Sequence, residues 1–195
     1  MNHDYGLKGL AFQLRPVGLQ DAAFIVEART SDPDRTRLIH SISADLDKQR
    51  LWITQYLERE GDYYWVIERL DTIRPEGLVA VYNVNMPERT AEWGRWVLRS
   101  GSLAAVESAW LVYRMAFEVL ALNSVYCLTV ADNARVVSFH ESCGLVCAGR
   151  FEKYCNLGGR PHDAIKHICA SENWPAVREK LEPIVRLTAS RIRRA

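Results

Sequence analysis

The chain has 195 residues, 48% of them hydrophobic, which is enough for one sizeable core and not obviously enough for two. Its 25 lysines and arginines nearly balance 24 aspartates and glutamates, so the net charge is only +1. This balance excludes a global positive field that would recruit nucleic acid or a membrane surface, and any anion site must be local. We expect a single domain over residues 1–195, with its core at about 12–174 and a helical tail at 174–194.

The sequence also bears on compartment and metal binding. It contains no apolar run long enough to span a bilayer, and its first residues lack the basic start and apolar core of a signal peptide, so we expect a cytoplasmic protein. Five cysteines without framework spacing indicate reduced thiols. His140, Cys143 and Cys147 are close in sequence, but Gly144 separates the two thiols and no second ligand pair follows. We therefore expect no metal site.

The first third of the chain predicts one strand and two helices. Residues 12–16 alternate apolar and polar side chains and end at a proline, as a short strand does. Apolar residues then mark one helix face over 19–26. Residues 29–45 are polar without a clear period, which indicates a loop or a broken helix. A helical pattern resumes over 46–60, and Gly61 follows where a C-terminal cap would fall.

The middle of the chain predicts three antiparallel strands followed by a long helix. Two β-rich segments, 63–70 and 78–85, flank the turn-forming residues 71–77 and read as a hairpin. Residues 92–98 form the next predicted strand, which ends at small residues. From Leu103 the apolar positions fall on one helix face: Val106, Ala109, Trp110, Tyr113, Phe117 and Leu120.

The last third alternates strands and helices. The apolar run 124–131 is typical of a central strand, and a short helix follows and ends near Gly144. Residues 145–155 and 162–170 predict a second hairpin, and 174–194 a final helix. Together the elements predict an α+β fold with a mixed, mostly antiparallel central sheet flanked by helices.

A helix that begins directly after a small-residue turn is a candidate anion site. The first turn of a helix carries unpaired N–H groups and the positive end of the helix dipole. Small side chains let an anion, typically phosphate, approach that backbone. The residues in question are Arg99, Ser100, Gly101, Ser102, Leu103 and Ala104.

This turn and a later segment resemble the core of the GNAT acetyltransferase superfamily. The loop of that family reads Gln or Arg, two residues, Gly, one residue, then Gly or Ala. The chain keeps Arg99 and Ala104, but Ser102 stands where the central glycine belongs and Gly101 lies one place early. The resemblance implies that the loop binds the pyrophosphate of acetyl-coenzyme A (acetyl-CoA).

The second segment, NARVVSFHESCGL, is similar to the family's N-x-x-A-x-x-L-Y-x-K-x-G-F helix. Asn133 and Gly144 match that pattern, and His140 stands where it usually has tyrosine. The resemblance covers about residues 12–174. It is most similar to the branch with ribosomal-protein N-terminal acetyltransferases and nucleotide-linked amino-sugar N-acetyltransferases.

Glu92 is the candidate general base of the implied acetyl transfer. Alternation along the strand places it on the same face as Gly94 and Trp96, and the family often has a base at this position. Its carboxylate would take a proton from the amine directly or through water. The alternative is an exposed glutamate paired with Arg95 or Arg89.

His140 is the candidate acid for the departing thiolate. A histidine with an unperturbed pKa of ~6.5 can hand a proton to a thiolate of pKa ~8.5 at neutral pH. The alternative is a histidine beside Glu141 that is merely packed or solvated.

The resemblance also implies the remaining cofactor contacts. Backbone groups near Trp96, Val97 and Leu98 would hold the oxyanion and the pantetheine, because the neighbouring strand splays away from them in this family. Asn133 matches the cofactor-contacting asparagine, although Asp132 and Asn133 are also ordinary helix caps.

Amide and aromatic residues near the same strand are candidates for acceptor binding. They suit a sugar or a nucleotide, and they also suit a sheet edge. These candidates are Tyr82, Asn83, Asn85 and Trp93.

We therefore expect an N-acetyltransferase that moves an acetyl group from acetyl-CoA to a primary amine on a small molecule, with a nucleotide-linked amino sugar favoured. A protein N-terminus and an aminoglycoside remain open as acceptors. A polyamine is least favoured, because the chain has no acidic cluster for a polycation. The second class left open is a non-catalytic module that binds acyl-CoA, and a homodimer is open as well.

Overall fold

The computed structural model describes residues 3–32 and 36–194, and within these residues eight strands form one sheet. The strands are β1 (Leu7–Lys8), β2 (Phe12–Pro16), β3 (Tyr63–Arg69), β4 (Pro75–Asn85), β5 (Thr90–Leu98), β6 (Ser124–Val130), β7 (Val146–Leu157) and β8 (Arg160–Ala170). Their order is β1-β2-β3-β4-β5-β6-β8-β7. Neighbours are antiparallel except β5 and β6, which confirms the predicted mixed, mostly antiparallel sheet.

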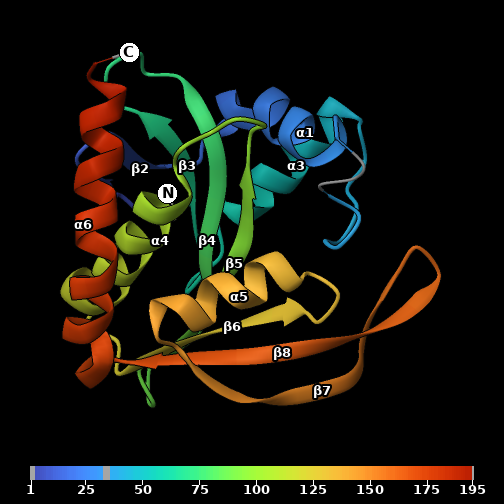
Figure 1. The fold of residues 1–195 in the computed structure, drawn as a ribbon. Helices are drawn as coiled ribbons and strands as arrows, with labels where there is room; N and C mark the ends of the chain where they lie inside the picture. The colour runs from blue at the N-terminus through green and yellow to red at the C-terminus, as the bar shows by residue number, and fades with distance from the viewer. Residues whose placement is uncertain (1–2, 33–35, 195) are drawn as a thin grey trace.

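Helices cover both faces of this sheet (Figure 1). They are α1 (Ala22–Thr30), α3 (Leu46–Tyr56), α4 (Ala105–Arg114), α5 (Ala134–Cys143) and α6 (Trp174–Ile192). Helices α1 and α3 pack together over β3 and β4 in one hydrophobic cluster. Helices α4 and α6 pack together on the opposite face in a larger cluster, which α5 joins through Phe139 and Cys143. The predicted α+β fold is confirmed.

Most predicted elements form within a few residues of their expected bounds. Strand β2 spans the predicted residues. The predicted long helix forms as α4 and continues through a π-helical turn, Met115–Val119. The second hairpin turns at Gly158 and Gly159, which both have positive φ, so the turn is shorter than predicted and β7 and β8 are longer.

The helix predicted over 46–60 is too long at its C-terminal end. Helix α3 ends at Tyr56, and Gly61 is not its cap. The buried Tyr56 hydroxyl accepts the Tyr64 backbone N–H at 2.8 Å, so the chain must turn within a few residues to start β3. Gly61 lies in that turn with φ of 67°. A tertiary contact therefore ends the helix before its apolar pattern does.

Two irregularities interrupt the central strands β4 and β5. Asn83 and Arg95 both have positive φ, 52° and 49°, at the points where the register between these strands shifts. A positive φ is costly for a residue other than glycine, and such strain concentrates at functional sites. Both irregularities lie beside the cavity described below.

Within the described residues no helix is long and apolar enough to cross a membrane. All five cysteines are free thiols, of which three are buried.

Candidate active site

A cavity of about 710 Å³ opens where β5 and β6 part. The two strands pair only from Thr90 with Ser124 to Glu92 with Tyr126. Beyond Glu92 the strands separate, as the family resemblance implies for the strand next to Trp96–Leu98. Both strands line the cavity, through residues 92–96 of β5 and 127–130 of β6. Because the strands separate, the backbone N–H and C=O groups on this edge of β5 have no strand partner beyond Glu92 among the described residues and are open to a ligand.

The structure brings seven of the sixteen predicted site residues to this cavity. Seven line it: Tyr82, Asn83, Glu92, Trp93, Trp96, Asn133 and His140. Asn85 does not, because it is the last residue of β4, where its Oδ1 accepts the N–H of Glu88 in the following turn at 3.2 Å. Val97, Leu98, Arg99 and Ser100 line a separate cavity of about 240 Å³ beside α1.

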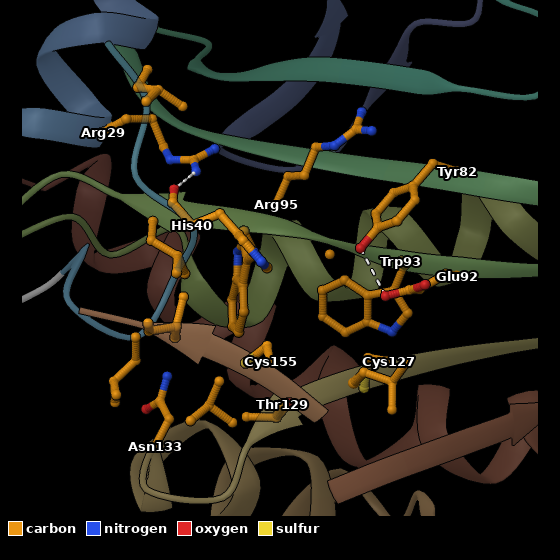
Figure 2. Close-up of a pocket in the computed structure, with 18 of the residues that line it drawn as sticks. Arg29, His40, Tyr82, Glu92, Trp93, Arg95, Cys127, Thr129, Asn133 and Cys155 are labelled. Carbon is orange, nitrogen blue, oxygen red and sulfur yellow. Dashed lines mark hydrogen bonds between the residues drawn. The ribbon is translucent and has the colours of Figure 1, made fainter. Parts of the chain in front are cut away.

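Glu92 is a buried carboxylate with two neutral hydrogen-bond donors. Only 7% of the residue is exposed. The Tyr82 hydroxyl donates to Oε1 at 2.8 Å, a bond drawn as a dashed line in Figure 2. The Asn83 amide donates to Oε2 at 3.2 Å. The alternative of an exposed glutamate paired with an arginine is wrong, since Arg95 pairs with Asp62 and Arg89 donates to the Ala121 carbonyl. A carboxylate at a cavity wall is placed to accept a proton from a bound amine.

The strand irregularity at Arg95 changes which side chains share a face. Regular alternation predicts Glu92, Gly94 and Trp96 together. Glu92 and Gly94 do face Tyr82, since a Cβ on Gly94 would lie 2.9 Å from the Tyr82 hydroxyl. Trp96 instead lies beside Trp93, with ring centroids 5.6 Å apart, on the α4 face. The predicted placement of Trp96 is therefore wrong, because the irregularity adds one residue to the strand.

His140 is buried in an aromatic environment. Its pKa is therefore not the unperturbed value on which its predicted role as an acid depends. It is 2% exposed, its ring packs edge-on against Trp93 at 5.2 Å, and His167 lies 5.4 Å away. Burial and, to a smaller extent, the neighbouring His167 together lower the pKa of His140 from 6.5 to about 3. At neutral pH the imidazole is uncharged, so it can donate only the hydrogen bond of a neutral N–H. Its Nδ1 has no partner among the described residues.

This buried histidine predicts a loss of stability in mild acid. The unfolded chain takes up the proton below about pH 6.5, and the folded chain does so only near pH 3. The free energy of unfolding should therefore fall as the pH drops through this window, by up to about 1.4 kcal/mol per pH unit. The measurement is urea unfolding of wild type and His140→Phe at pH 6.5 and pH 5. The variant should lose about 1.6 kcal/mol less. Equal losses would mean that His140 titrates normally in the folded state.

The turn before α4 forms an open helix N-terminus. Gly101, at φ of 77°, supplies the left-handed residue of the turn, which explains a glycine one place earlier than in the family pattern. The Ala104 N–H bonds to the Ser102 hydroxyl at 3.2 Å, and Ser108 is the first residue to bond back into the helix. Within the described residues no bond is made by the N–H groups of 105–107. These groups and the helix dipole suit a phosphate.

Arg99, the first residue of this loop, is held by α1. Its Nη2 lies 2.7 Å from both carboxylate oxygens of Glu27, and its guanidinium packs over the Phe24 ring. The arginine that the family pattern supplies therefore pairs with a neighbouring carboxylate in this structure.

Asn133 faces the cavity and does not cap α5 with its side chain. It is the residue before α5, but its amide makes no capping bond, and the Asp132 carboxylate pairs with His162 at 2.7 Å. The expectation that these side chains cap the helix is wrong. Asn133 is one of the residues that line the cavity, and Figure 2 labels it.

The opposite part of the cavity is cationic and aromatic, and the sequence did not indicate it. Arg29 of α1 lines it and donates to the His40 carbonyl at 2.5 Å (Figure 2). Lys48 and Trp52 of α3 also line it, with Arg95 from β5. Among the described lining residues Glu92 is the one acid. Residues 3–32 and 36–194 offer no carboxylate ion-paired with Arg29 or Lys48.

No three His, Cys, Asp or Glu residues of the described chain come close enough together to hold an ion.

The chain is similar to known acetyltransferases in sequence and in fold. A family model described as an acetyltransferase (GNAT) domain matches residues 12–146. The structure of apo FdhC, a nucleotide-linked sugar GNAT, is 28% identical, with a TM-score of 0.78 over 94% of this chain and 99% of that chain. A mutant of the spermidine N-acetyltransferase SpeG from Vibrio cholerae is 20% identical, with a TM-score of 0.74 over 85% and 97%. At that identity the likeness concerns the fold alone. No curated protein is significantly similar in sequence.

Proposed function

The chain belongs to the GNAT acetyltransferase family, and on that premise we propose that it moves the acetyl group of acetyl-CoA to the primary amine of a nucleotide-linked amino sugar. The family uses acetyl-CoA as co-substrate. The observation that carries the proposal is one cavity that joins the separated β5 and β6, a buried carboxylate and a cationic wall.

The residues present fit acetyl-CoA. The unbonded N–H groups of residues 105–107 suit its pyrophosphate, and they directly follow the loop Arg99–Ala104 that the family pattern assigns. The open edge of β5 at Trp96–Leu98 suits the pantetheine, and the Asn133 amide is available because it caps nothing. When bound, acetyl-CoA supplies an acyl group activated as a thioester.

Residues of this chain supply the other groups that acetyl transfer needs. Glu92 takes the proton of the acceptor amine, directly or through water, because an amine attacks only when neutral. Tyr82 and Asn83 fix the carboxylate by donating to its two oxygens. Backbone N–H groups at Trp96 and beyond face the developing oxyanion. His140 is proposed as a neutral hydrogen-bond donor to the departing thiolate.

The acceptor is proposed from the charge of the cavity and from the similarity to FdhC. Arg29 and Lys48 suit a phosphate, and they oppose a polyamine because like charges repel. Trp52 and Tyr82, which are half-buried, offer stacking surfaces for a base or a sugar ring. A nucleotide-linked amino sugar carries a diphosphate and an amine. The diphosphate would lie near Arg29 and Lys48, and the amine would lie near Glu92.

A panel of amines tests the acceptor. Release of free CoA and the mass of the product are followed with a nucleotide-linked amino sugar, the same sugar without its nucleotide, spermidine and a peptide with a free N-terminus. We expect the highest kcat/KM with the nucleotide-linked sugar. Equal values for the free sugar, or a preference for spermidine or the peptide, would contradict the proposed acceptor.

Arg29→Gln should raise the KM for the nucleotide-linked acceptor by about tenfold or more, since it removes a charged hydrogen-bond donor to phosphate. The value for the free sugar should not change. The matched control is Arg50→Gln, because Arg50 is exposed on α3, pairs with Asp47 and does not line the cavity. A KM unchanged in Arg29→Gln would remove Arg29 from the acceptor site.

A further inference from the structure

A series of contacts across three elements leads from an ion pair to the carboxylate of Glu92. Asp62 lies just before β3, Arg95 is on β5 and Tyr82 is on β4. Arg95 keeps a positive φ of 49° at the strand irregularity, an unfavourable conformation for a residue other than glycine. The surrounding contacts must therefore hold it in place.

The ion pair between Arg95 and Asp62 uses both ends of the guanidinium. Nη1 donates to Oδ1 at 2.6 Å and Nη2 donates to Oδ2 at 3.0 Å. Side-chain exposure is 24% for Arg95 and 10% for Asp62. This two-point geometry fixes the plane of the guanidinium. It also occupies the groups with which Arg95 would otherwise bind an anionic acceptor.

The fixed guanidinium lies on the face of the Tyr82 ring, 4.4 Å from its centroid. A cation over an aromatic face holds the ring by electrostatic attraction. Gly94 allows this arrangement, because a Cβ there would lie 2.9 Å from the Tyr82 hydroxyl. Figure 2 shows the Tyr82 ring between Arg95 and Glu92, with its hydroxyl directed at the carboxylate.

Tyr82 passes this restraint to the proposed base. Its hydroxyl donates to Glu92 Oε1 at 2.8 Å. Burial and the Glu92 carboxylate raise the pKa of Tyr82 well above its ordinary value, although Arg95 lowers it. The hydroxyl is therefore a donor throughout the neutral range. A phenol polarised by a nearby cation is also a stronger donor.

We propose that Asp62 and Arg95 are positioning residues that orient Glu92 through Tyr82. The inference rests on the proposed function, in which Glu92 is the base. Arg95 binds neither substrate in this scheme. Its effect appears in the rate of proton removal and not in the affinity for either substrate.

A double-mutant cycle tests the path through Tyr82. Tyr82→Phe and Arg95→Gln should each lower kcat about tenfold and leave the Kd of acetyl-CoA unchanged. The double variant should be no slower than Tyr82→Phe alone, because the two residues act in series. The matched control is Arg59→Gln, since Arg59 also contacts Asp62, at 3.8 Å, but lies over Trp52 and not over Tyr82. Its kcat should be that of wild type.

Two kinetic results would overturn the proposal. If Arg95→Gln slows the Tyr82→Phe enzyme by a further tenfold, Arg95 acts independently of Tyr82. If Arg95→Gln raises only the KM for the acceptor, Arg95 binds the acceptor directly. Melting temperatures of all variants show whether each is folded at the assay temperature.

A second readout does not need catalysis. The ¹³C chemical shift of the Glu92 carboxyl carbon, at one fixed pH, reports the hydrogen bond from Tyr82. It should move in the same direction in Tyr82→Phe and in Arg95→Gln, and stay unchanged in Arg59→Gln. An unchanged shift in Arg95→Gln overturns the positioning role. If wild type acetylates no amine but the shifts move as expected, the proposed function fails and the positioning of Glu92 stands.

Discussion

Glu92→Gln is expected to lower kcat for acetyl transfer by about 10²–10⁴-fold and to leave the Kd of acetyl-CoA nearly unchanged. Glutamine keeps the shape of the side chain, and its carbonyl oxygen can still accept the Tyr82 hydroxyl that lies 2.8 Å from Oε1. It cannot accept a proton at neutral pH. The loss should therefore appear in the chemical step, measured by single-turnover kinetics at saturating substrates.

The matched control is Glu88→Gln, which removes an exposed carboxylate from the turn between β4 and β5, outside the cavity. It should retain wild-type kcat. Turnover in Glu92→Gln equal to that of wild type would show that Glu92 is not the base. The buried carboxylate would then have a structural role, as an acceptor for Tyr82 and Asn83.

Ser102→Glu is expected to raise the Kd of acetyl-CoA by about 10–100-fold, because it places a carboxylate against the phosphates at the start of α4. Once acetyl-CoA saturates the variant, kcat should recover, since the change lies away from Glu92. The measurement is calorimetric titration of acetyl-CoA, followed by initial rates at high concentration.

Ser102→Ala separates charge from structure. It removes the hydroxyl that accepts the Ala104 N–H at 3.2 Å without adding charge, and it should weaken binding only a few-fold. Normal affinity in Ser102→Glu would mean that the pyrophosphate lies elsewhere. In that case the Arg99 side chain, which pairs with Glu27, would have a role other than binding the pyrophosphate.

The sheet was largely predictable because its signals are local. Strand β6 is nearly continuous in apolar residues, and the start of α4 is marked by small residues followed by a change of period. The end of α3 was not predictable, because a hydrogen bond from Tyr64 to the Tyr56 hydroxyl decides it. That contact depends on the packed fold.

The site residues were predictable only where a family motif or a regular strand pattern marks them in the sequence. Glu92 and Asn133 line the cavity as expected from the family pattern, yet the face of Trp96 was wrong because nothing in the sequence marks the irregularity at Arg95. Arg29 and Lys48 lie near or within a polar stretch without a period, so no pattern placed them beside Glu92. Tertiary packing of α1 and α3 brings them there.

Thermal unfolding with and without acetyl-CoA tests the central claim most directly, because a ligand that binds only the folded state stabilises it by mass action. At 100 times its Kd the gain is about 2.7 kcal/mol, which for a chain of this length raises Tm by roughly 5–10 °C. We predict a rise of this size with acetyl-CoA and a smaller one in Ser102→Glu at the same concentration. No rise at saturating acetyl-CoA would contradict the account, since it would leave a GNAT fold that no longer binds the co-substrate.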